Sequence, residues 1–170
     1  MMKHTLLKPG KALLATALLG IVFTACNDDD LPDPPAKRSK EYALTVSNGT
    51  GGGKVTAREL TDSTFDLIVR IDKSTRDTTY KFALYSGDKE DGTLELFQEI
   101  ASIKSETSGA PVEAKWAGVK TVTVDGVTRK FNYDSLLKYE AFARVSFVDQ
   151  AAMPAKDSVV AIGNIGASAQ

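Results

Sequence analysis

The chain has 170 residues, of which 42% are hydrophobic and 25% are charged. This composition suits one globular domain with an extension, and it argues against a disordered chain or a fibrous repeat. The formal net charge is -1, and Lys3, Lys8 and Lys11 are the only charged residues before Cys26. Without these three lysines, 18 basic and 22 acidic side chains remain. The body of the chain is therefore mildly acidic and has no basic cluster, which argues against nucleic-acid binding.

An apolar run, LLATALLGIVFTA at residues 13–25, follows the three lysines. It is short for a membrane-spanning helix, which needs about 20 apolar residues, and it suits the apolar core of a secretory signal. We therefore predict that residues 1–25 are a signal peptide that is removed. A retained anchor helix is the alternative interpretation.

The residues FTAC at positions 23–26 resemble the lipobox of bacterial lipoproteins, although Phe23 replaces the aliphatic residue that is usual there. In that family the cysteine is acylated and becomes the first residue, so the resemblance implies lipid attachment, including palmitate, at Cys26. An exported chain with one cysteine has no internal disulfide partner, which agrees with this role. Stable anchoring takes more than one acyl chain, at about 0.8 kcal/mol per buried methylene. The multiple acylation that the resemblance implies would hold the protein on a membrane.

Residues 26–40, CNDDDLPDPPAKRSK, are polar and proline-rich, which is typical of an extended tether. Residues 27–30, NDDD, also resemble the acidic export signal of Bacteroidetes-type lipoproteins. That resemblance implies a lipid-anchored protein on the outer face of the outer membrane. A solvated linker in a periplasm-facing lipoprotein is the alternative.

From residue 41 onward the hydrophobic pattern has a period of two, which predicts β-strands. The clearest example is TFDLIVRID at residues 64–72, with Phe65, Leu67, Val69 and Ile71 on one face. Further strands are expected at YALTVS (42–47), TYKFALYS (79–86), TLELFQEIASI (93–103), AFARVSFV (141–148) and SVVAIGNI (158–165). The stretch KTVTVDGVTRKF, residues 120–131, predicts a hairpin that turns at an Asp-Gly pair.

The helical candidate is YDSLLKYE at residues 133–140, where Asp134 is expected to cap one or two turns. Seven to nine short strands over residues 41–166 predict an all-β domain, an antiparallel Greek-key β-sandwich of Ig-like type, with a barrel as the alternative. The last five residues, GASAQ, are expected to be frayed.

Residues 133–166, YDSLLKYEAFARVSFVDQAAMPAKDSVVAIGNIG, resemble the closing section of chordin-type (CHRD) domains, especially those of small bacterial lipoproteins. In that family a Tyr-Asp pair and a short helical turn lead into a strand, and the final strand ends in Gly-x-Ile, here Gly163-Asn164-Ile165. The resemblance implies a β-sandwich without catalytic activity. Family members often carry a His-Ile-His-x-Gly stretch, but the corresponding residues 83–87 read ALYSG. No ligand or metal role of those histidines is therefore carried over.

His4 is the only histidine, and it lies within the predicted signal peptide. The mature protein is therefore expected to lack histidine-dependent catalysis and histidine-based zinc sites. An enzyme that uses only carboxylates on surface glycans is an alternative function, because a glycosidase needs only two of them. We identify no catalytic pair, and no cofactor is expected.

The stretch SGDKEDGT, residues 86–93, gathers Asp88, Glu90 and Asp91 between two glycines. Carboxylate oxygens in a loop can hold Ca²⁺, but the spacing does not match an EF-hand. A hairpin turn with hydrated acids is the favoured interpretation, and a Ca²⁺-dependent adhesion module is the alternative.

Taken together, these patterns favour a non-enzymatic surface lipoprotein whose β-sandwich is a binding or structural module of the cell envelope. The expected partners are the membrane, through the lipid on Cys26, and envelope proteins or glycans. Exposed Trp116, Tyr85 and Tyr139 would suit glycans, although a core or rim position is favoured for Trp116. The sequence does not identify the ligand.

Overall fold

Ten β-strands and one short helix form within the part of the chain that this computed structural model describes, residues 37–46, 52–91, 94–149 and 153–170. The predicted signal peptide and Cys26 lie outside these residues. The elements are β1 (Ser39–Val46), β2 (Gly53–Thr61), β3 (Thr64–Ile71), β4 (Thr79–Ser86), β5 (Leu96–Lys104), β6 (Val112–Val119), β7 (Thr121–Val124), β8 (Val127–Lys130), α1 (Tyr133–Lys138), β9 (Glu140–Asp149) and β10 (Lys156–Gly166).

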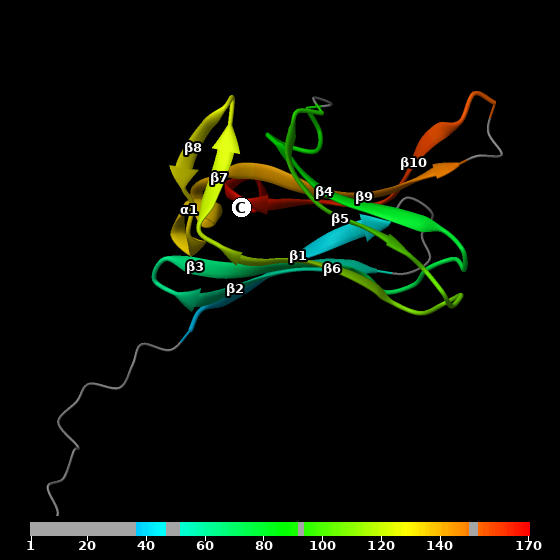
Figure 1. Cartoon of the computed structure of the whole chain (residues 1–170), viewed down its shortest axis with the longest axis horizontal. Helices are drawn as coiled ribbons and strands as arrows, with labels where there is room; N and C mark the ends of the chain where they lie inside the picture. Colours follow the sequence, from blue (N-terminus) through cyan, green and yellow to red (C-terminus); the bar gives the residue numbers. More distant parts are fainter. Residues whose placement is uncertain (1–36, 47–51, 92–93, 150–152) are drawn as a thin grey trace, which may run out of the picture. The chain divides into compact units, whose positions relative to one another are not determined.

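Eight of the strands form one folded antiparallel sheet in the order β5-β4-β9-β10-β1-β2-β3-β6. Strand β1 pairs with β2 over residues 39–44 and then with β10 at Thr45 and Val46, so it passes from one layer to the other. The layer of β2, β3 and β6 therefore faces the layer of β10, β9, β4 and β5 (Figure 1). Long connections place β6 beside β3 and β9 beside β4, as in a Greek key. The predicted all-β antiparallel sandwich is confirmed.

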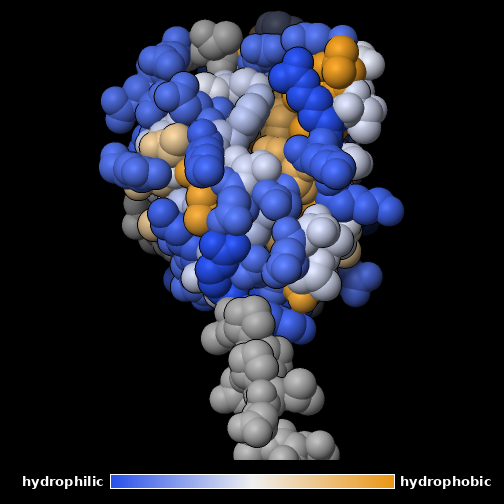
Figure 2. Space-filling view, turned by 90° about the vertical axis from the view of Figure 1, so that its left-hand side faces the viewer, coloured by the Kyte–Doolittle hydropathy of each residue, from blue (hydrophilic) through white to orange (hydrophobic). Residues whose placement is uncertain are grey.

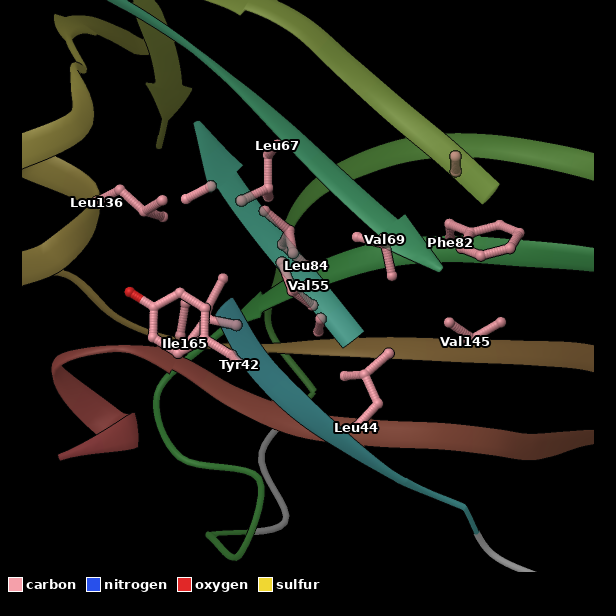
Figure 3. Close-up of a cluster of buried hydrophobic side chains, with 14 of the residues drawn as sticks. Tyr42, Leu44, Val55, Leu67, Val69, Phe82, Leu84, Leu136, Val145 and Ile165 are labelled. Carbon is pink, nitrogen blue, oxygen red and sulfur yellow. The ribbon is translucent and has the colours of Figure 1, made fainter. Parts of the chain in front are cut away.

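The core lies between the two layers and follows the alternation that the sequence predicts. Phe65, Leu67 and Val69 of β3 are fully buried. They face the opposite layer, where Phe82 of β4 and Val145 of β9 point inward (Figure 3). Burial of each large apolar side chain contributes about 1.5–3 kcal/mol, so this shared interior supplies most of the driving force for folding.

Strand β1 passes so close to β10 that only glycine fits at position 163. A Cβ atom on Gly163 would overlap the carbonyl oxygen of Ala43 and would lie 3.0 Å from Cδ2 of Leu44. Two residues further along β10, Ile165 is fully buried in the core. The Gly-x-Ile stretch therefore has a structural role, in which the glycine admits β1 and the isoleucine packs beneath it.

The short helix and the Asp-Gly hairpin form where the sequence predicts them. Asp125 and Gly126 join β7 to β8 with φ angles of 52° and 76°, the positive values of a tight hairpin turn. Helix α1 is capped by Asn132, whose side-chain oxygen accepts a 3.0 Å hydrogen bond from the backbone amide of Ser135. The expected cap at Asp134 is therefore wrong, because that residue lies inside the first turn.

Other expectations differ from the structure at the ends and in the number of strands. The sequence pattern does not predict β2 and β6 individually. The ten strands of the described residues therefore exceed the expected seven to nine. The C-terminus is not frayed, because Ala167–Ala169 form a 3-10 turn and the amide of Ala167 donates a 2.9 Å hydrogen bond to the carbonyl of Tyr139. The first strand begins at Ser39, three residues before the strand predicted at residues 42–47.

We expect Gly163→Ala to lower the free energy of unfolding by about 1–3 kcal/mol, because the added methyl group forces β1 away from β10. Chemical denaturation followed by circular dichroism measures the change. Ser102→Ala, on the exposed side of β5, is the control and should change the free energy by less than about 0.5 kcal/mol. Equal stability of Gly163→Ala and the unmodified chain would contradict the close approach.

Candidate functional site

The acidic loop that holds Asp88, Glu90 and Asp91, for which a calcium site was the alternative interpretation, is folded against the last strand. One carboxylate oxygen of Asp88 accepts a 2.7 Å hydrogen bond from the side-chain amide of Asn164, and the other accepts a 2.8 Å bond from the backbone amide of Glu90. The side-chain oxygen of Asn164 in turn accepts a 3.0 Å bond from the amide of Lys89. Within the described residues no three acidic, cysteine or histidine side chains gather as metal ligands. Asp88 and Asn164 therefore act together to fasten the loop.

Trp116 and Tyr139, considered above for a glycan platform, pack into an aromatic cluster beside the core. Trp116 stacks on Phe131 at 6.5 Å between ring centroids and makes edge contacts with Phe65 and Phe97, each at 6.4 Å. Tyr139 stacks on Phe97 at 4.6 Å. The favoured prediction for Trp116, a core or rim position, is confirmed.

Tyr85 belongs to β4 and lies outside this aromatic cluster, beside β9. Its ring stacks on that of Phe142 at 5.3 Å, and the guanidinium carbon of Arg144 lies 5.8 Å from its centroid. Arg144 also pairs with Asp157 at 3.1 Å. The structure therefore does not bring Tyr85, Trp116 and Tyr139 together in one aromatic platform.

A cluster of charged side chains stands where the chain leaves the predicted tether and begins β1. Arg38 donates two hydrogen bonds to the Glu59 carboxylate, 2.8 Å from Nε and 2.7 Å from Nη2. It also donates a 2.7 Å bond from Nη1 to Asp134, and its guanidinium lies 4.8 Å from the ring centroid of Tyr133. This Arg38 cluster joins the start of β1 to β2 and α1.

The surrounding surface at this end carries α1 and the β7–β8 hairpin and is mostly hydrophilic. In Figure 2, which faces this end, hydrophobic areas are narrow and lie between hydrophilic side chains. Val127 of the hairpin is 51% exposed, but the other residues of β8 are polar or charged. This end therefore offers no broad apolar surface for docking.

The charged clusters hold their carboxylates in the ionised state. The hydrogen bonds from Arg38 lower the pKa of Glu59 to about 2 and hold the pKa of Asp134 below its ordinary value. Burial opposes ionisation of Asp66, yet Lys115, the Gly118 amide and Arg58 together keep its pKa low. A carboxyl group that stays ionised near neutral pH cannot serve as a general acid there, and the ion pairs of these clusters join neighbouring elements of the fold.

A V-shaped notch opens at the opposite end, because the ladder between β4 and β9 stops before the strands do. Their pairing runs from Ser86 and Ala141 only as far as Lys81 and Ser146. Strand β4 begins two residues earlier, and β9 continues to Asp149 in partnership with β10. The β9–β10 hairpin therefore diverges from β4 in Figure 1. The hollow between them has a volume of about 450 Å³ and is lined by residues 77–79, Lys81 and residues 147–149.

The physical cause of the notch is a β-bulge in β10. The register between β9 and β10 shifts between Val159 and Ala161, opposite Ser146 and Val145. Ser146 is also the last β9 residue that pairs with β4. Because a bulge bends its strand and increases the local twist, the extra residue turns the β9–β10 arm away from β4 at this point.

The β4 side of the notch is braced by two buried serines in the neighbouring loops. The hydroxyls of Ser74 and Ser105 lie 2.6 Å apart, and that of Ser74 donates to the carbonyl of Ala110 at 2.7 Å. The backbone of Ser105 bonds to both Asp77 and Thr78, which begin this wall. These hydrogen bonds therefore hold the β4 wall in place.

The notch was not predicted from the sequence, because it arises from a difference in pairing length and has no residue motif. Its chemistry is mixed. Thr78 and Thr79 supply hydroxyl groups, Phe147 supplies an apolar surface, and Lys81 has an exposed ammonium without an ion pair among the described residues. The arrangement suits non-covalent binding of a small extended group, and its volume lies within the usual range of ligand sites, about 300–1,000 Å³.

We expect the Arg38 cluster to make stability depend on pH in the acidic range. The folded-state pKa of Glu59, about 2, lies below its ordinary value of 4.5, so its stabilising effect is present above about pH 4.5 and is lost as the pH falls toward 2. Glu59→Gln should therefore unfold at a lower temperature than the unmodified chain at pH 7, and the two midpoints should converge near pH 2.

Thermal unfolding followed by circular dichroism over pH 2–7 measures this convergence. Glu113→Gln is the control, because Glu113 is exposed on β6 and makes no ion pair within the described chain. A constant difference between Glu59→Gln and the unmodified chain over the whole pH range would contradict the assigned role of Glu59.

Neither a protein-family model, nor a curated protein, nor a solved structure matches this chain. The fold and the candidate site are therefore described from the chain's own residues, and the chordin-type resemblance stays a prediction. Among the helices of the described residues, none is both long and apolar enough to cross a membrane.

Proposed function

We propose that this chain is a non-enzymatic lipoprotein of the outer membrane, anchored through Cys26, whose β-sandwich is a binding or structural module of the cell envelope. The observation that supports it best is the Arg38 cluster, with two ion pairs of 2.7 Å at the point where the predicted tether meets the domain. A domain carried on a tether benefits from a fixed attachment point, because a terminal strand that is not tied down tends to fray.

The chemistry of the carboxylates supports a role without catalysis. Every carboxyl group with a displaced pKa in the described chain is displaced downward by a neighbouring cation, namely Glu41, Glu59, Asp66 and Asp134. A glycosidase needs one carboxyl group with a raised pKa to protonate the leaving group. The alternative of a carboxylate-only enzyme on surface glycans therefore gains no support from these residues.

The alternative of a Ca²⁺-dependent adhesion module is disfavoured by the bonding of Asp88. Both of its carboxylate oxygens already accept hydrogen bonds, one from Asn164 and one from Glu90. Calcium would need several oxygen ligands free to converge, so binding would require the loop to be released from β10.

The anchoring prediction concerns Cys26. In the native bacterium we expect the unmodified chain to incorporate labelled palmitate and to sediment with the outer membrane. Cys26→Ser should lose the label and should leave the membrane fraction, because no acyl chain remains to bury in the bilayer. Subcellular fractionation with immunoblotting measures both effects.

Protease treatment of intact cells then separates the two orientations. Digestion without permeabilisation indicates the cell surface, and protection indicates that the domain faces the periplasm. A Cys26→Ser chain that still sediments with the membrane would overturn the proposed lipid anchor.

A further inference from the structure

We propose that the junction between the tether and the domain is a cleavage site for trypsin-like proteases, and that the Arg38 cluster keeps this site closed. Hydrolysis there adds one water molecule across a backbone peptide bond. It leaves a carboxylate on the tether and an amine on the domain, and it releases the domain from its anchor. The inference deepens the proposed function and rests on its tethered arrangement.

The basic residues of the junction stand at its last two positions. A trypsin-like protease cuts after a lysine or an arginine, because its specificity pocket takes a long cationic side chain. Residues 27–36, NDDDLPDPPA, contain neither. Lys37 and Arg38 follow directly, and β1 begins at Ser39. Between Cys26 and β1, such a protease can therefore cut only after these two residues.

The side chain of Arg38 is already bound to carboxylates of the domain. Its guanidinium donates four hydrogen bonds of 2.7–3.2 Å, two to Glu59 and two to Asp134. A guanidinium has five N–H groups, so most of its donors are in use. The bonds to Glu59 matter more, because that side chain is 10% exposed whereas that of Asp134 is 52% exposed. Arg38 can enter a specificity pocket only after these bonds break.

The backbone on the domain side of both peptide bonds belongs to the sheet. The carbonyl of Arg38 accepts a 2.9 Å hydrogen bond from the amide of Glu59. The next residue, Ser39, pairs with Arg58 in the ladder between β1 and β2. Proteases cut backbone that is free of such bonds. The first residues of β1 must therefore leave β2 before either peptide bond can reach a catalytic centre.

Cleavage at the junction thus requires a local opening of the start of β1. This opening is separate from global unfolding, because the described pairing of β1 with β10 lies further along, at Thr45 and Val46. When opening and closing are fast relative to cleavage, the cleavage rate follows the population of the open form. Loss of the charged hydrogen bonds to Glu59 raises that population. The Arg38 cluster therefore controls how fast the domain is released.

The test uses the full-length protein, purified in mild detergent and digested with a small amount of trypsin. Labelling of new amino termini followed by mass spectrometry quantifies the cuts after Lys37 and Arg38 separately from cuts elsewhere. We expect Glu59→Gln to be cut at the junction at least about tenfold faster than the unmodified chain, because the charged bonds to Arg38 are lost. Glu113→Gln is the matched control and should change this rate less than about twofold.

A second variant separates local opening from a general loss of stability. Ser74→Ala removes a buried hydroxyl at the opposite end of the domain, so it should lower the free energy of unfolding as Glu59→Gln does. The rate of junction cleavage in Ser74→Ala should nevertheless stay within about twofold of the unmodified chain, because its Arg38 cluster is intact. Circular dichroism checks that every variant is folded during digestion.

Equal rates of junction cleavage in Glu59→Gln and the unmodified chain would overturn the proposal. So would an equal acceleration in Ser74→Ala, or cleavage of the unmodified chain as fast as that of a synthetic peptide with residues 33–42. The new amino terminus is detected whether or not the chain carries a lipid. Failure of this proposal is therefore distinguishable from failure of the lipid anchor, which the fractionation of Cys26→Ser tests.

Discussion

The close approach of β1 to Gly163 is the constraint on which the rest of this fold depends. Among the described strands, β1 alone pairs with both layers, and it makes that passage at Ala43–Leu44, directly over Gly163. A side chain at this position would separate β1 from β10 and leave two sheets in place of one folded sheet. Both ends of the domain depend on this passage, because β1 begins beside the Arg38 cluster and ends in the layer that contains the notch.

The two ends differ in how they use polar groups. At the α1 end, Arg38 forms ion pairs with two carboxylates and lies over the ring of Tyr133. These contacts fix the start of the first strand. At the notch end, the buried serines Ser74 and Ser105 brace a wall while the ammonium of Lys81 stays exposed to solvent. Charges that are already paired contribute to stability and not to recognition, whereas an unpaired charge beside open strand edges can contribute to binding. The two ends therefore differ in that the described charges of the Arg38 cluster are paired, whereas Lys81 lines the notch without an ion pair among the described residues.

Much of the fold could be predicted from the sequence, because buried strands in a sandwich keep a period of two. Phe65, Leu67 and Val69 show that pattern clearly, and Asp125-Gly126 marks its turn by backbone preference alone. Strands β2 and β6 were missed because polar residues obscure their alternation, for example the buried Glu59 of β2. That carboxylate can occupy a buried position only because Arg38, 21 residues earlier, pairs with it. A partner so distant in sequence leaves no local signal.

The candidate site could not be predicted from the sequence for a different reason. The pairing register of β4, β9 and β10 creates the notch, and no residue motif marks it. A single extra residue in β10, between Val159 and Ala161, bends the β9–β10 arm at the point where β4 loses its partner. The strand register sets the position of the walls, so substitutions on the lining change the chemistry of the notch without removing it. Lys81 is the one cationic side chain among the residues that line the hollow. A site of this kind tolerates change in most of its residues but depends strictly on the strand register that opens it.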